Sequence, residues 1–105
     1  MNSDIKIRKV FDDIKYKNEN FNFAYRVSTI MYNEDETRIL LFYGDDMEFY
    51  MLPGGKVKEQ ERSIDAIKRE IYEELGYKNL EFKFAGVSEE LISEKDKFIQ
   101  EITIT

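Results

Sequence analysis

The sequence contains neither cysteine nor histidine. Disulfide bonds, Ser-His and Cys-His catalytic pairs, and thiolate or imidazole ligands for a metal ion are therefore excluded. If the protein is an enzyme, carboxylates, lysine, tyrosine or metal-bound water must carry out its acid and base chemistry.

The sequence also lacks long apolar runs and an excess of positive charge. Residues 1–20 are polar and do not resemble a signal peptide, and no run approaches the roughly 20 apolar residues of a membrane span. We therefore expect a cytoplasmic protein without a membrane partner. The net charge of −6 disfavours stable binding to nucleic acid, because neutralising its phosphates requires lysine and arginine. A phosphorylated ligand would need another source of positive charge, and a divalent cation is the obvious one.

The hydrophobic content of 42% over 105 residues suits one small packed domain. Alternating or β-branched and aromatic residues predict strands at 4–11, 21–32, 38–43, 48–52, 81–88 and 98–105. Polar residues predict loops or turns at 12–20, 33–36, 44–46 and 89–96, and Pro53-Gly54-Gly55 is expected to break the sheet. This mixed order of elements predicts an α+β fold.

Residues 63–75 form the clearest predicted helix. Its apolar residues recur at helical spacing and make one stripe: Ile64, Ile67, Ile71 and Leu75. Ser63 is the expected N-cap, Asp65 falls in the first turn, and Gly76 is the expected glycine after the last turn.

The sequence ends at Thr105, inside or just after a predicted strand. A terminal strand of this kind is unusual unless it lies in the middle of a sheet. We therefore expect residues 1–105 to be a single domain that lacks a C-terminal portion.

Residues 55–77 read GKVKEQERSIDAIKREIYEELGY. This segment resembles the Nudix box, G-x5-E-x7-R-E-U-x-E-E-x-G-U, in which U is a bulky aliphatic residue. Every fixed letter is present at the right spacing, and the one departure is Tyr77 at the last U, a packing position. The preceding Leu52-Pro53-Gly54 also fits the family. A motif with this many fixed positions is far more specific than a lone glycine-rich loop.

The resemblance implies a Nudix hydrolase with an α/β/α sandwich and a mixed sheet. It implies hydrolysis of a nucleoside diphosphate linked to another moiety, assisted by Mg²⁺, for which Mn²⁺ can substitute. Glu73 and Glu74 would be metal ligands together with the Gly54 carbonyl, and Glu70 would be a ligand or the base. Arg69 would hold a glutamate in position, and Glu61 would steady the site.

The helix itself gives a physical reason for this chemistry. Glu70, Glu73 and Glu74 are spaced i, i+3 and i+4, so their carboxylates share one face. Like charges at this spacing repel, and a cation between them relieves the repulsion. Mg²⁺ prefers oxygen ligands and bridges to phosphates. The alternative is a solvated acidic face, which is the usual meaning of a charge run.

Candidates outside the box are weaker. Arg26, in the strand predicted at 21–32, is a candidate contact for a substrate phosphate, and Glu101, in the last strand, is a candidate additional carboxylate. Glu89 and Glu90 compete with Glu101 for that role. A surface role is the plain alternative for each of these residues.

Two functions remain open at this point. The first is an active pyrophosphohydrolase, and the second is a catalytically silent Nudix-like module that binds a nucleotide and regulates a partner. The box does not name the substrate among ADP-ribose, nucleotide sugars, nucleoside triphosphates and dinucleoside polyphosphates. It also leaves the oligomeric state open, although a homodimer would be in keeping with many family members.

Overall fold

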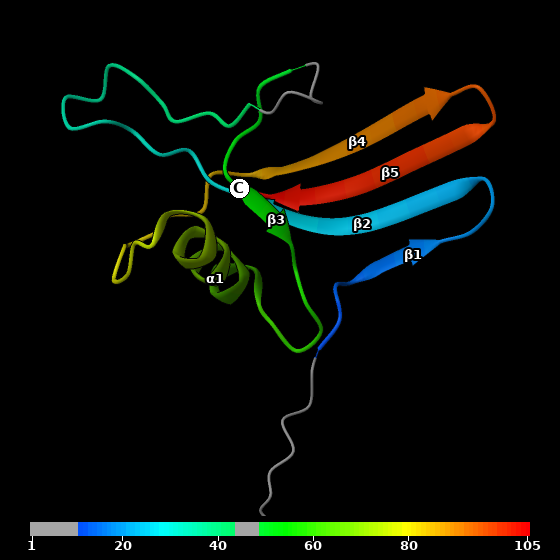
Figure 1. Ribbon diagram of the computed structural model, residues 1–105, viewed down its shortest axis with the longest axis horizontal. Helices are drawn as coiled ribbons and strands as arrows, with labels where there is room; N and C mark the ends of the chain where they lie inside the picture. The colour runs from blue at the N-terminus through cyan, green and yellow to red at the C-terminus, as the bar shows by residue number, and fades with distance from the viewer. Residues whose placement is uncertain (1–10, 44–48) are drawn as a thin grey trace, which may run out of the picture.

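The computed structural model describes residues 11–43 and 49–105. The strand predicted from residue 4 and the turn predicted at 44–46 lie outside these residues. The elements are β1 Lys15–Lys17, β2 Phe21–Ser28, β3 Gly54–Lys56, α1 Ser63–Leu75, β4 Val87–Glu94 and β5 Lys97–Ile104. Figure 1 shows the strands as one curved sheet with α1 beside one end of it.

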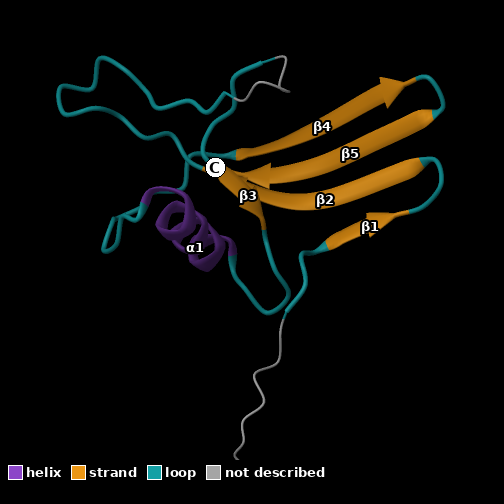
Figure 2. Cartoon of the chain, in the orientation of Figure 1, coloured by secondary structure: helices purple, strands orange, loops and turns teal. Residues whose placement is uncertain are grey.

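The sheet is mixed, with the order β1-β2-β5-β4. β2 and β5 are parallel, β4 is antiparallel to β5, and β3 pairs antiparallel with the last residues of β2. One helix on a mixed sheet confirms the predicted α+β class (Figure 2). Within the described residues, α1 is the helix that covers the sheet.

The core lies between α1 and the end of the sheet that carries β3. Its buried members come from β2, from the residue after β3 and from the helix: Val27, Val57, Ala66, Ile67 and Ile71. Ile64, Leu75 and Ile104 pack around this cluster and are partly exposed. The predicted apolar stripe of the helix is therefore the buried face.

Helix α1 spans Ser63–Leu75, as the spacing of apolar residues predicts. The predicted N-cap was wrong: Arg62 occupies that position without a side-chain cap hydrogen bond, and Ser63 is the first helical residue. The Arg62 guanidinium instead pairs with Asp65 at 3.2 Å. Gly76 ends the helix with a φ of 78°, and its N–H donates to the carbonyl of Tyr72.

The loop predicted at 12–20 is partly wrong, because it contains β1, which pairs with β2. Asn18 makes the connecting turn, in which its Oδ1 accepts hydrogen bonds from the amides of Asn20 and Phe21 at 3.0 and 2.9 Å. A side chain that satisfies two amides makes a tight turn between short strands. The strand predicted at 21–32 is confirmed as far as Ser28, where β2 ends.

The strands predicted at 38–43 and 48–52 were also wrong for the described residues. Ile39 and Phe42 make only isolated bridges, to Tyr32 and Met51. Apolar side chains in this region remain exposed, among them Leu41. The segment therefore does not obtain the burial that its β-branched and aromatic residues would need to form a strand of the sheet. The turn predicted at 33–36 is confirmed by a hydrogen bond from Glu36 N–H to the Asn33 carbonyl at 3.0 Å.

Gly54 and Gly55 continue the sheet, although the sequence predicts that they break it. Gly54 lies opposite Ser28, and a Cβ on Gly54 would lie only 2.1 Å from the Val27 carbonyl oxygen. Because glycine has no Cβ, the backbones of β2 and β3 can approach closely enough to pair.

The last strands form a hairpin. β5, at Lys97–Ile104, closely confirms the strand predicted at 98–105. The strand predicted at 81–88 was wrong for residues 81–86, which have no regular structure, and is confirmed only for Val87 and Ser88, where β4 begins. The loop predicted at 89–96 was wrong as well, because most of it is β4, followed by a turn at residues 95 and 96.

Candidate active site

The acidic residues of α1 lie on the side of the helix that meets β3. The buried stripe fixes the rotation of the helix, because Ile67 and Ile71 point into the core. Glu70 and Glu74 then lie next to the glycines of β3, because the Glu70 carboxylate lies over Gly55 and the Gly54 backbone hydrogen-bonds Glu74. The fold thus brings the acidic helix face to the backbone of Gly54 and Gly55.

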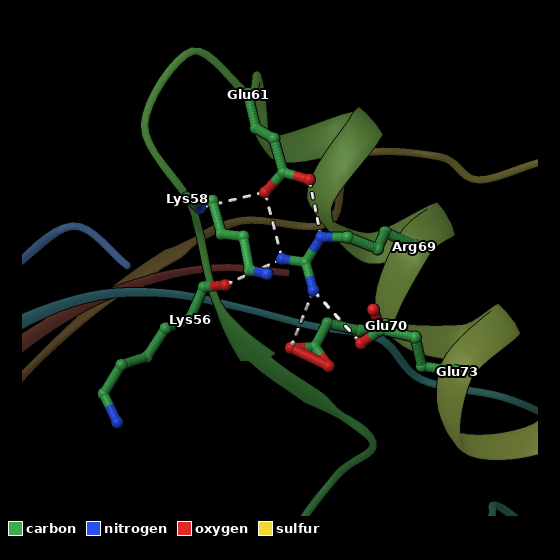
Figure 3. Close-up of polar contacts among 6 residues, drawn as sticks. All are labelled: Lys56, Lys58, Glu61, Arg69, Glu70 and Glu73. Carbon is green, nitrogen blue, oxygen red and sulfur yellow. Dashed lines mark hydrogen bonds and ion pairs between the residues drawn. The ribbon is translucent and has the colours of Figure 1, made fainter. Parts of the chain in front are cut away.

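Arg69 makes most of the polar contacts at this face. Its Nε donates to Glu61 Oε2 at 2.6 Å, and one terminal nitrogen donates to Glu61 Oε1 and to the Lys56 carbonyl, each at 3.0 Å. The other terminal nitrogen donates to Glu73 Oε1 at 3.2 Å and lies 3.5 Å from Glu70 Oε2. Figure 3 shows the guanidinium between Glu61 on one side and Glu70 and Glu73 on the other.

The Glu61–Arg69 pair ties the loop before α1 to the helix. Glu61 Oε1 also accepts a hydrogen bond from the Lys58 amide at 2.9 Å. The hydrogen bond from Arg69 is the main cause that lowers the pKa of Glu61, and the bond to Glu61 raises the pKa of Arg69. Both groups therefore stay charged at neutral pH, in a bidentate geometry that is stronger and more directional than a simple ion pair.

Glu70 is the most buried of the acidic residues on the helix, with its side chain 16% exposed. Its carboxylate lies over Gly55: a Cβ on Gly55 would lie 1.9 Å from Oε2. Burial raises the pKa of Glu70, and the negative charges of Glu73 and Asp13 raise it further. The positive charge of Arg69 acts to lower it. The positive charge of Arg69 therefore offsets only part of the free-energy cost of burying this carboxylate.

Glu74 lies one turn beyond Glu70. Burial and the negative charge of Glu70 raise its pKa, while a hydrogen bond from the Gly54 backbone and the charge of Arg26 act to lower it. Glu74 is thus close to Gly54, and Arg26 on β2 lies near enough to influence it.

Glu73 points to Arg69, and its side chain is 52% exposed. Among the residues that the structure describes, no three acidic, histidine or cysteine side chains are grouped so that they could hold a metal ion. The three glutamates share a face, as the helix predicts, but their carboxylates do not converge. The metal site therefore stays a prediction.

The donor set nevertheless suits a hard divalent cation. The carboxylates and the nearby backbone of β3 offer oxygen ligands, which Mg²⁺ prefers. Burial and mutual repulsion raise the pKa values of Glu70 and Glu74, and a bound cation would relieve both effects. The exposed Glu73 has room to change its rotamer toward its neighbours.

Arg26 and Glu101 lie on the face of the sheet opposite the core. Val27 pairs with Ile104, which packs against the core, and Ile102 lies two residues before Ile104 on the same face. Side chains alternate along a strand, so the adjacent Arg26 and Glu101 lie on the other face. Glu101 lies opposite Ala24 and Glu90, whereas Arg26 lies opposite Lys56 of β3. The charge of Arg26 acts on Glu74, whereas Glu101 lies further along the same sheet face.

Two residues near the site were not candidates from the sequence. The Lys56 carbonyl accepts from Arg69, and the charge of Asp13 influences Glu70. Lys56 lies inside the Nudix box at a variable position, so its type carries no signal. Asp13 comes next to Lys58 through an isolated bridge between distant segments, which local sequence patterns do not reveal.

Together the fold and the site define a class of small α+β domains in which an acidic helix follows a glycine-containing strand. The sequence pattern of the NUDIX domain family matches residues 22–105, the greater part of the chain. The chain belongs to this family.

Two individual proteins are similar to it. An 8-oxo-dGTP diphosphatase of Buchnera aphidicola subsp. Schizaphis graminum (strain Sg) is 47% identical over 38 residues, which are 36% of this chain and 29% of the relative. The solution structure of the E. coli ORF135 protein matches with a TM-score of 0.53 and 22% identity, over 78% of this chain and 59% of that protein. The second likeness is one of fold. The matched regions span less than two thirds of either relative.

Among the described residues, no helix combines the length and apolar character needed to cross a bilayer.

Proposed function

We propose that this protein is a pyrophosphohydrolase that cleaves a nucleoside diphosphate linked to another moiety, in the presence of Mg²⁺. The observation that carries the proposal is the acidic face of α1, held against the β3 backbone by Arg69 and Glu61. Membership of the NUDIX domain family supports it. A cytoplasmic location suits such a substrate.

Glu73, Glu74 and the Gly54 carbonyl would hold the metal ion, and Glu70 would be either a further ligand or the base. A bound ion would supply positive charge to offset the pyrophosphate oxygens and would make water at the site more acidic. Arg69 keeps Glu73 and Glu70 oriented, and Glu61 keeps Arg69 in place through two hydrogen bonds. Outer partners of this kind typically affect metal affinity or activity by about 10–100-fold.

In the second of these roles, Glu70 would accept a proton from the attacking water. It is more buried than Glu73, and its raised pKa makes its carboxylate a better base than an exposed glutamate. The water attacks phosphorus, the bridging oxygen departs with one phosphate, and a nucleoside monophosphate and a phosphorylated second product result. No covalent enzyme intermediate is needed.

Arg26 would contact a substrate phosphate next to the metal site. Its charge already influences Glu74, and Lys56 lies opposite it on β3. Two cations beside an acidic site would attract the phosphates that the protein's overall negative charge repels. Glu101 shares the sheet face of Arg26 and would meet parts of the substrate that extend across it.

The test is hydrolysis of a substrate panel with Mg²⁺, with phosphate measured after a phosphatase is added. The panel contains ADP-ribose, nucleotide sugars, nucleoside triphosphates and dinucleoside polyphosphates. 8-oxo-dGTP is added because a similar protein bears its name. We expect turnover that is lost in Glu73→Gln and in Glu74→Gln, while the charge-matched control Glu34→Gln keeps it.

A silent nucleotide-binding module is the competing function. It predicts tight binding of a nucleotide by calorimetry and no turnover on the whole panel. Turnover that survives both glutamine variants would equally contradict the proposed mechanism.

A further inference from the structure

β4 is the outermost strand of the sheet (Figure 1). Its inner side pairs with β5 along all eight of its residues. Within residues 11–43 and 49–105, no strand pairs with its outer side. β4 contains no proline or glycine to interrupt it. A regular edge of this kind presents a row of backbone groups that can accept another strand.

The hydrogen bonds to β5 determine which residues of β4 face outward. Gly86 and Thr105 exchange two backbone hydrogen bonds, of 3.1 and 2.9 Å. Bonded and non-bonded pairs alternate along an antiparallel ladder, so the even-numbered residues of β4 bond to β5. The odd-numbered residues direct their N–H and C=O groups to the open edge: Val87, Glu89, Leu91 and Ser93.

The side chains of these odd-numbered residues lie on the sheet face that carries the core. Val87 lies opposite the core neighbour Ile104, which fixes the face. α1 packs on β2 and β3 and leaves this part exposed. Val87, Leu91 and Phe98 are 56%, 76% and 52% exposed there. The open edge therefore carries two exposed apolar side chains, Val87 and Leu91, with Phe98 of β5 behind Ser93 on the same face.

We propose that β4 pairs antiparallel with β4 of a second copy of this chain, centred on Leu91. In this register Leu91 lies opposite its own copy, and each glutamate lies opposite an uncharged residue. Glu89 faces Ser93, Glu90 faces Ile92, and Glu94 faces Ser88. The two sheets become continuous, and the exposed apolar side chains near the edge are drawn together.

Neighbouring symmetric registers place like charges in contact. Centring the pair on Glu89 or on Glu90 puts two copies of that glutamate directly opposite each other. Centring it on Ile92 puts Glu90 opposite Glu94. Like charges directly opposite each other across two strands are destabilising. Among the registers centred on residues 89 to 92, the acidic residues of β4 therefore favour the one centred on Leu91.

The first test is sedimentation velocity over a range of protein concentrations. We expect a reversible dimer that Leu91→Glu converts to a monomer, because two buried carboxylates would then meet at the centre. The matched control is Tyr16→Glu, which adds the same charge at a 56% exposed position of β1 on the opposite edge, and it should leave the dimer intact. A monomer at the highest soluble concentration overturns the proposal, as does a dimer that withstands Leu91→Glu.

The second test fixes the register and does not depend on a destabilising variant. The chain has no cysteine, so Leu91→Cys introduces one thiol per copy. Opposed residues in a bonded antiparallel pair have Cα atoms about 5.5 Å apart, within the range of disulfides. We expect oxidation to cross-link Leu91→Cys many-fold faster than Glu89→Cys, which faces Ser93. Equal rates would overturn the proposed register. Neither position belongs to the acidic helix, so the outcome is independent of the proposed hydrolysis.

Discussion

Arg69 connects three parts of the site, because its guanidinium contacts Glu61, the Lys56 carbonyl and Glu73. The Glu61 and Arg69 side chains are 19% and 21% exposed, so solvent screens their interaction less than it screens a surface pair. The pair joins the loop before α1 to the middle of the helix. Its loss should therefore affect both stability and the orientation of the acidic residues.

Glu61→Gln should destabilise the fold by about 1.5–3 kcal/mol, the range for a hydrogen bond to a charged group. The measurement is urea unfolding at neutral pH. Glu34→Gln, in an exposed turn, is the control and should change the free energy of unfolding little. A Glu61→Gln variant as stable as the control would contradict a structural role for the pair.

The same variant should change the response to acid. Arg69 lowers the pKa of Glu61 below its ordinary value of 4.5, so the folded state holds the proton less tightly than the unfolded chain. The stabilisation is then complete above pH 4.5 and is lost as the pH falls through the lower, folded pKa. The free energy of unfolding of Glu61→Gln should depend less on pH in this acid range, and identical slopes for the two proteins would count against the interaction.

Gly55→Ala tests the contact between β3 and Glu70. An added Cβ would lie 1.9 Å from the Glu70 carboxylate, which must then move. We expect activity to fall by about 10–100-fold, as for the loss of other groups that orient a metal ligand. Gly86→Ala is the matched control, because a Cβ there meets nothing within 4 Å. Activity in Gly55→Ala equal to that of the control would remove Glu70 from the proposed site.

At the scale of the elements, the glycine after helix α1 marks clearly where the helix ends. Gly76 has a φ of 78°, a conformation that costs other residues roughly 1–2 kcal/mol, with asparagine tolerated better. Gly76→Ala should therefore lower the free energy of unfolding by about that amount, and Gly76→Asn should lower it less. Urea unfolding checks both. Equal losses would mean that the left-handed conformation does not determine the cost.

The helix could be predicted from the sequence because Ile67 and Ile71 are buried and repeat at helical spacing. β4 could not, because almost all of its residues are exposed and its glutamates resemble a loop. Pairing with β5 makes it a strand, and such pairing is a long-range effect. Phe82 and Phe84 suggested a strand just before it, yet Phe84 is 72% exposed and the segment is irregular.

At the scale of the whole molecule, the net charge of −6 repels phosphates, and a cation bound at the proposed site would offset that repulsion. The spacing of the box makes Glu61, Arg69 and the helix glutamates candidates from the sequence alone, and the structure brings Arg69 into contact with Glu61, Glu70 and Glu73. The sequence does not reveal that Glu73 turns to Arg69 or that Asp13 approaches Glu70. Those contacts depend on how distant segments pack, which spacing along one helix does not encode.

The central claim is that the glutamates of α1 and the backbone of β3 hold a divalent cation. The most direct measurement is an amide NMR spectrum recorded while paramagnetic Mn²⁺ is added. The signals of Gly54–Lys56 and of residues 69–75 should broaden first, and Glu74→Gln should require more Mn²⁺ for the same effect. The claim is contradicted if those signals stay sharp, or if they broaden no earlier than the signals of the acidic strand β4.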